Sequence, residues 1–136
     1  MQTYVLDAFA LLSWLRKESG ASEVVSLLRQ AEKGQVKLLM CIVNLGEVIY
    51  RTLREYGQQR TEEVLVLVQA LPIEFIDADR PLALSAAAFK GVHRMSYADC
   101  FAAALAQRES AAIVTGDPHF RQVEGPVAIE WLPSPE

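Results

Sequence analysis

Short continuous runs of hydrophobic residues alternate along this chain with longer segments whose hydrophobic residues recur at helical spacing. The continuous runs predict strands at 3–7, 36–43, 73–77 and 111–117, with a fifth, at the edge of the sheet, at 127–132. The periodic segments predict helices at 8–17, 21–34, 44–57, 60–71, 79–93, 96–109 and, for a short one, 118–123. Because strands and helices alternate, we expect an α/β fold: a three-layer α/β/α sandwich around a mostly parallel sheet of four to five strands.

The size and composition of the chain predict one globular domain covering residues 1–136. Hydrophobic residues make up 51% of the chain and charged residues 22%, which is typical of a folded domain with a single core. No apolar run is long enough to span a membrane, and no basic residue precedes the first apolar segment, so neither a membrane span nor a signal peptide is expected. Cys41 and Cys100 lie in separate apolar segments, which favours buried thiols in a reducing cytoplasm.

The net negative charge of the chain limits how the protein can bind a nucleic acid. The formal net charge is −4 and the sequence pI is about 5.2, which argues against a simple cationic nucleic-acid binder. An acidic protein can still act on nucleic acid where cations or a local basic patch offset the repulsion.

Four acidic residues lie at or near predicted helix starts: Asp7, Glu47, Asp99 and Asp117. Each has a structural interpretation, as an N-cap or as part of a capping box. Asn44 and Glu47 form an N-x-x-E pattern, and Ser96 and Asp99 form the weaker S-x-x-D version. Asp117 precedes a proline, and Asp7 ends the first strand, so both are suitable N-caps. A cap contributes about 1 kcal/mol, which is enough to explain any one of these acids alone.

The predicted topology brings the four acids together. In a parallel α/β sheet the strand-to-helix turns lie at the carboxyl edge, where ligands bind. The Asp99 helix runs antiparallel to the strand that follows it, so its start lies at the same edge. Carboxylates gathered there would repel one another unless a cation is present. Oxygen ligands favour Mg²⁺ or Mn²⁺ over zinc, and such ions support phosphodiester hydrolysis.

Four segments that contain these acids resemble the motifs of PIN-domain ribonucleases: "YVLDAFALLSWL", "NLGEVIYR", "SYADCFAAALA" and "VTGDPHF". The resemblance covers essentially the whole chain and is greatest to the VapC-like toxins of toxin–antitoxin pairs. It implies a single PIN-like domain that is a metal-dependent RNA endonuclease, with Asp7, Glu47, Asp99 and Asp117 as the catalytic, Mg²⁺- or Mn²⁺-binding residues.

The resemblance also implies supporting residues and partners. Thr115 matches a hydroxyl residue that often lines the site. Two positions depart from the family pattern: Ala8 stands where Ser or Thr is frequent, and His119 where an acid is frequent, so no metal role is expected at 119. A homodimer and a groove for an antitoxin segment between the early helices are also implied, in a cytoplasmic protein.

Basic residues near the predicted edge are candidates for binding RNA phosphates. Arg51 follows Glu47 by four residues, and Lys90, His93 and Arg94 precede the Asp99 helix. Taken alone, each of them is explained more simply as part of a solvated helix end.

The sequence argues against three other kinds of active site. A haloacid dehalogenase-type phosphatase needs an acid at the position of Phe9, and a phosphorelay receiver needs an acidic pair and a late lysine that are absent. Neither histidine lies in a nucleophilic triad pattern. The remaining alternative is a catalytically inactive PIN scaffold that binds RNA or a protein partner.

Overall fold

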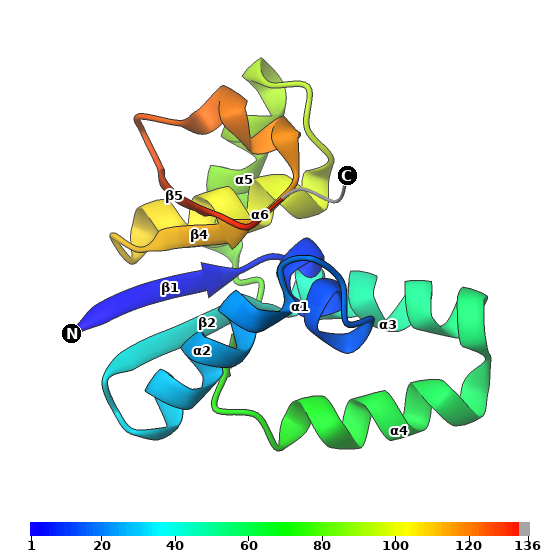
Figure 1. Cartoon of the computed structure of the whole chain (residues 1–136). Helices are drawn as coiled ribbons and strands as arrows, with labels where there is room; N and C mark the ends of the chain where they lie inside the picture. Colours follow the sequence, from blue (N-terminus) through cyan, green and yellow to red (C-terminus); the bar gives the residue numbers. More distant parts are fainter. Residues whose placement is uncertain (134–136) are drawn as a thin grey trace.

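A single five-stranded parallel sheet forms the centre of the protein. The computed structural model describes residues 1–133. The strands are β1 (Gln2–Leu6), β2 (Val36–Cys41), β3 (Glu74–Ile76), β4 (Ala112–Thr115) and β5 (Ala128–Trp131). Their order is β3-β2-β1-β4-β5, so β1 lies in the middle and β5 is at one edge (Figure 1). All neighbouring strands are parallel, as the alternation of strands and helices predicts.

Helices cover both faces of this sheet. They are α1 (Ala8–Leu15), α2 (Ala21–Glu32), α3 (Ile42–Tyr56), α4 (Gln58–Gln69), α5 (Arg80–Val92), α6 (Tyr97–Arg108) and the 3₁₀ helix η1 (Pro118–Val123). In Figure 1, α5 and α6 lie in the upper half of the view with β4 and β5, whereas α1 and α3 lie to the right of β1 and β2, and α2 and α4 lie below them. None of the helices within residues 1–133 is long and apolar enough to span a membrane.

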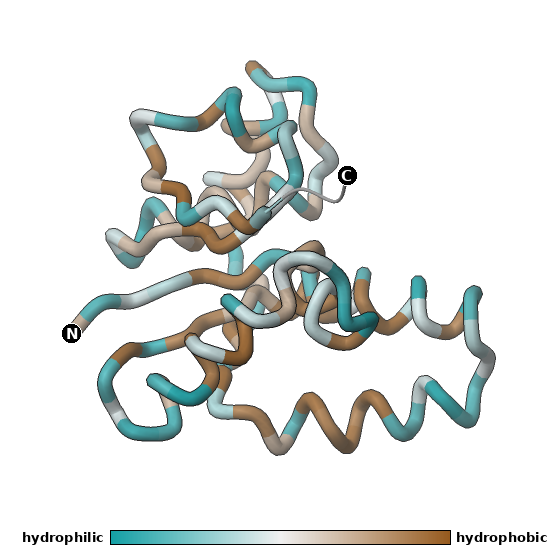
Figure 2. The backbone as a smooth tube through the Cα atoms, viewed as in Figure 1, coloured by the Kyte–Doolittle hydropathy of each residue, from teal (hydrophilic) through white to brown (hydrophobic). Residues whose placement is uncertain are grey.

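The core consists of two hydrophobic clusters, one on each face of the sheet. Alternate strand residues enter each cluster: Val5, Leu39 and Ile113 pack with α5, α6 and η1, whereas Leu6, Met40 and Val114 pack with α1 to α4. Figure 2 shows the hydrophobic residues concentrated on these central strands and hydrophilic ones at the α3–α4 turn. The expected three-layer α/β/α sandwich is therefore confirmed. Cys41 and Cys100 are free and buried in the same cluster, as predicted.

The start of α3 differs from the prediction. The strand expected at 36–43 ends at Cys41, and the helix begins at Ile42 with no side-chain cap. Asn44 therefore lies within the first turn of α3, fully buried, and the capping box predicted for Asn44 and Glu47 is wrong. Its side-chain Nδ2 instead donates to the carbonyl of Ala98, at 3.0 Å. The apolar run continues across the strand–helix junction, so the hydrophobic pattern does not reveal the boundary.

Other boundaries shift by a few residues. The helix predicted at 8–17 ends at Leu15, and Gly20 is the N-cap of α2. The fourth helix starts at Gln58, immediately after Gly57, whose φ of 85° separates α3 from α4. These shifts leave the topology unchanged.

Candidate metal centre

Asp7 lies where β1 ends at the carboxyl edge of the sheet. It is the N-cap of α1, as predicted: its Oδ1 accepts from the backbone N–H of Ala10 at 2.9 Å. Its Oδ2 accepts from the hydroxyl of Thr115 at 2.5 Å. Asp7 is only 1% exposed, so this carboxyl group is both buried and held by two donors.

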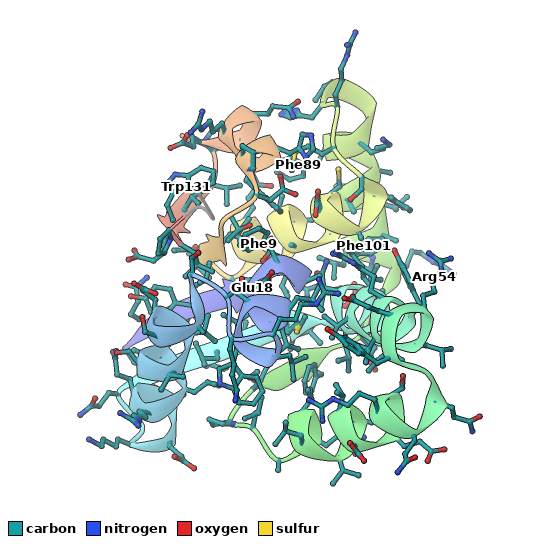
Figure 3. All side chains as sticks on the ribbon, turned by 45° about the vertical axis from the view of Figure 1, so that its right-hand side comes forward. Phe9, Glu18, Arg54, Phe89, Phe101 and Trp131 are labelled. Carbon is teal, nitrogen blue, oxygen red and sulfur yellow. The ribbon has the colours of Figure 1, made fainter. Side chains whose placement is uncertain are left out.

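Thr115 joins the ends of β1 and β4. While its hydroxyl donates to Asp7, its Oγ1 accepts from the backbone N–H of Asp117 at 3.0 Å. Gly116, between the two, packs against the ring of Phe9: a Cβ there would lie 2.4 Å from its Cε1. Figure 3 labels Phe9 on α1, near the centre of the molecule. Only glycine fits at position 116 without moving this ring, so β4 and α1 meet closely at the site.

Asp117 and Asp99 are both held by local helix-start geometry. Asp117 is the N-cap of η1, and its Oδ1 accepts from the backbone N–H of His119 at 2.9 Å. Asp99 lies in the first turn of α6, where its own N–H donates to the capping Ser96 Oγ at 3.1 Å. Both caps were predicted and are confirmed. Each places a partly buried carboxylate at the sheet edge.

Glu47 reaches the sheet edge from within a helix rather than from a helix start. It belongs to the second turn of α3 and is not a helix-start acid, because α3 begins at Ile42. Its side chain is half-buried and faces Arg51 one turn later, with 3.7 Å between Oε2 of Glu47 and Nη1 of Arg51.

The pKa values of Asp7, Asp99 and Glu47 are raised, chiefly by burial and further by neighbouring carboxylates. Burial raises the pKa of Asp7 from 3.8 to about 8, and the charges of Asp99 and Asp117 act in the same direction against the lowering by Thr115 and Ala10. Burial also raises the pKa of Asp99 to about 6, with the charge of Asp117 as the next cause. Burial raises the pKa of Glu47, offset in part by Arg51. This edge is therefore a region where a cation would relieve unfavourable charge.

Three side chains lie close enough together that small rotations would let them share an ion. Asp99, Asp117 and His119 each offer a ligand atom, and these atoms lie within 4.8 Å of one another. Asp7 and Glu47 are not in this group, but their carboxyl groups interact electrostatically with those of Asp99 and Asp117. The oxygen-rich donor set fits a hard divalent cation such as Mg²⁺ or Mn²⁺. His119, for which no metal role was expected, lies among these donors.

The predicted basic residues before α6 differ in their contacts and in their exposure to solvent. Lys90 Nζ donates to the carbonyl of Met95 at 2.6 Å, so it holds the loop that precedes α6. His93 caps the end of α5 and packs edge-on against Phe89. Arg94 is exposed, and Gln122 of η1 binds both its backbone N–H (2.9 Å) and its carbonyl (3.2 Å). Arg94 is thereby fixed beside η1, the helix that Asp117 caps.

Two residues that support the site were missed at the sequence level. Gln122 fastens the loop of Arg94 to η1 across 28 positions of sequence. Asn44 fastens α3, which carries Glu47, to the start of α6, which carries Asp99. Its Oδ1 has no hydrogen-bond partner among residues 1–133. In the sequence, Asn44 is a polar residue next to an apolar run. That pattern is typical of a buried hydrogen-bonding residue as well as of an N-cap.

Comparisons with known proteins agree with this fold. No curated protein sequence matches the chain significantly. The solved structure of VapBC2 from Rickettsia felis, bound to a promoter DNA fragment, superposes with a TM-score of 0.75 at 16% identity, covering 97% of this chain and 100% of that one. VapC20 from Mycobacterium tuberculosis, a sarcin-ricin loop cleaving toxin, gives 0.75 at 12% identity, with 96% and 99% covered. DNA-bound VapBC from Salmonella typhimurium gives 0.71 at 21% identity, with 96% and 98% covered.

At such identities these likenesses establish a shared fold. The family follows from the sequence itself, because a model of the PIN domain matches residues 4–126, which contain every acid at the sheet edge. With the motifs, the parallel sheet and the family match in agreement, the chain belongs to the PIN domain family.

Proposed function

We propose that this protein is a metal-dependent endoribonuclease that hydrolyses RNA phosphodiester bonds, and that it is the toxin of a toxin–antitoxin pair in the cytoplasm. The observation that carries the proposal is the convergence of Asp7, Glu47, Asp99 and Asp117 at one edge of a PIN-domain sheet, where the carboxyl groups of the first three have raised pKa values. Membership of the family and the fold shared with VapC20 support the nuclease assignment.

The residues have distinct roles in this proposal. Asp99 and Asp117 are the outer ligands of Mg²⁺ or Mn²⁺, because they are partly exposed and close together. Asp7 is the buried ligand, oriented by Thr115 and by its cap to Ala10. Glu47, paired with Arg51, is a further metal-binding carboxylate whose charge interacts with that of Asp117. When bound, the ion supplies Lewis-acid stabilisation of charge on the phosphate being cleaved.

The RNA backbone is proposed to lie across the exposed loop before α6. Arg94 is its strongest contact candidate, since its backbone is fixed by Gln122 while its side chain is exposed. His93 and Arg51 flank the same edge, and Lys90 contributes mainly by holding the loop. These cations offset the acidic site for an anionic substrate.

Replacing Arg94 with glutamate is expected to weaken RNA cleavage on the order of tenfold, because it puts a negative charge where a phosphate binds. Initial rates on a fluorescent RNA, with circular dichroism to verify folding, measure this effect. Arg29→Glu, the same reversal on an exposed position of α2, is the control and should cleave like the wild type. Equal rates for Arg94→Glu and Arg29→Glu would remove Arg94 from the substrate site.

The antitoxin is proposed to occupy a groove between α1 and the α3–α4 pair. This groove combines apolar and cationic side chains; its lining is Leu12, Leu15, Arg16, Lys17, Thr52, Tyr56, Arg60 and Val64. It lies in the early-helix region expected from the family resemblance.

The proposed homodimer would double the mass of 15.1 kDa in light scattering, and a monomeric mass would exclude it.

Metal-dependent cleavage is the direct test of the proposed function. Incubated with a pool of structured RNAs, the wild-type protein should cut in Mg²⁺ or Mn²⁺, stop with excess EDTA and resume when the ion is restored. Single-stranded DNA of the same sequences serves as the comparison substrate and should remain intact. A wild-type protein that cuts no RNA in either ion would favour the inactive scaffold.

A further inference from the structure

His119 lies beside two candidate ligands that come from different elements. Asp117 and His119 belong to the start of η1, whereas Asp99 comes from the first turn of α6. A ligand atom of each lies within 4.8 Å of the other two. Ligands about 2.1 Å from one ion lie at most about 4.2 Å apart, so small side-chain rotations would bring all three onto one ion.

The start of η1 places the exposed imidazole beside the carboxylate of Asp117. Asp117 Oδ1 accepts from the backbone N–H of His119 at 2.9 Å, and the same oxygen lies 3.0 Å from the ring Nδ1. Pro118, between the two, fixes φ at the first position of η1. Phe120, the next residue, is fully buried and anchors the helix. The carboxylate of Asp117 and the imidazole of His119 therefore lie side by side at the start of η1.

A ring nitrogen changes which ions the site prefers. Mg²⁺ requires oxygen ligands and keeps much of its water, whereas divalent first-row transition ions accept imidazole together with carboxylate. An acid at position 119 would give a purely oxygen donor set. The histidine present here replaces one oxygen donor by nitrogen without removing Asp99 or Asp117.

We propose that His119 is a nitrogen ligand in the metal centre and makes it select a divalent first-row transition ion over Mg²⁺. This inference rests on the proposed function, whose metal site it specifies. It assigns position 119 to metal selection, in place of a cap contact with Asp117 alone or a contact with an RNA phosphate.

Mn²⁺ is the probe, because its unpaired electrons report a directly bound nitrogen by electron spin-echo spectroscopy. The wild-type protein with one equivalent of Mn²⁺ should show nitrogen modulation that shifts when histidine is labelled with ¹⁵N. His119→Ala should lose it. His93→Ala, which changes the chain's other histidine, is the matched control and should retain it. Affinities follow from titration of free Mn²⁺ and from displacement by Mg²⁺.

The affinities give a second readout that does not depend on cleavage. His119→Ala should bind Mn²⁺ at least about tenfold more weakly, with Mg²⁺ affinity changed less than about threefold. Bound Mn²⁺ without nitrogen modulation, in a protein that still cleaves RNA, would overturn the inference and leave the proposed function standing. Failure of the wild type to bind Mn²⁺ more tightly than Asp99→Asn would overturn the metal site itself.

Discussion

Asp7→Asn is expected to abolish RNA cleavage while leaving the metal-free protein at least as stable as the wild type at pH 8. Loss of residues that only orient a metal ligand already costs 10- to 100-fold in many sites, so loss of a ligand should cost more than about 100-fold. The fold tolerates the change because asparagine is also a good N-cap and can still accept from Ala10. Steady-state rates in Mn²⁺ and urea unfolding without metal measure the two effects.

The stability effect has a definite sign and pH window. The pKa of Asp7 is about 8 in the folded protein and near 3.8 in the unfolded chain, so the folded state binds more protons between these values. The free energy of unfolding therefore falls as pH rises from about 4 to 8, and the favourable contribution is lost by about pH 8. Asp99, with a pKa of about 6, acts in the same direction but is ionised sooner. Asp7→Asn should remove the Asp7 part of this slope across the whole window from about pH 4 to 8, leaving only the Asp99 part, which ends near pH 6.

Asp79→Asn is the matched control for this experiment. Asp79 is also an N-cap, accepting from the backbone N–H of Leu82, but it lies at the start of α5 and pairs with Arg108. The Leu82 hydrogen bond and the Arg108 charge hold the pKa of Asp79 below its ordinary value, so its substitution should not stabilise the protein at pH 8. Its cleavage rate should match the wild type. Wild-type cleavage by Asp7→Asn would exclude Asp7 as a ligand.

The fold could be predicted because strand and helix periodicities differ clearly along most of the chain. The edge acids could be placed because three of them lie at helix starts whose caps have local sequence signals. Asp7 and Asp117 cap helices that follow strands, and Ser96 caps the helix of Asp99. Such signals depend on residues within three positions of one another, which the sequence displays directly.

Contacts between distant segments could not be predicted from the same signals. The tether from Asn44 to Ala98 spans 54 positions, and nothing local distinguishes it from a cap. The hydrogen bonds of Gln122 with Arg94 span 28 positions and likewise appear only once η1 packs beside the loop before α6. His119 illustrates the limit: its neighbour Asp117 is visible in sequence, whereas its approach to Asp99 depends on tertiary packing.

Asp99→Asn and Ser96→Ala should separate the two interpretations of the α6 start. Asp99 contributes its backbone N–H to the cap, and the Ser96 hydroxyl accepts it at 3.1 Å. Asp99→Asn keeps that N–H, so it should keep the cap and remove cleavage by more than about 100-fold. Ser96→Ala keeps the carboxylate and removes the acceptor, so it should cost about 1 kcal/mol in the free energy of unfolding while cleavage persists.

The raised pKa of Asp99 adds a prediction about the free energy of unfolding to this comparison. Since burial and the charge of Asp117 raise the pKa of Asp99 to about 6, ionisation of Asp99 opposes folding as pH rises from about 4 to 6. Metal-free Asp99→Asn should therefore be as stable as the wild type at pH 7, or more so, whereas Ser96→Ala should be less stable. Urea denaturation of both variants, with cleavage assayed on the same samples, decides between the roles. A destabilised but active Asp99→Asn would identify Asp99 as a structural residue, because loss of a metal ligand should also reduce RNA cleavage.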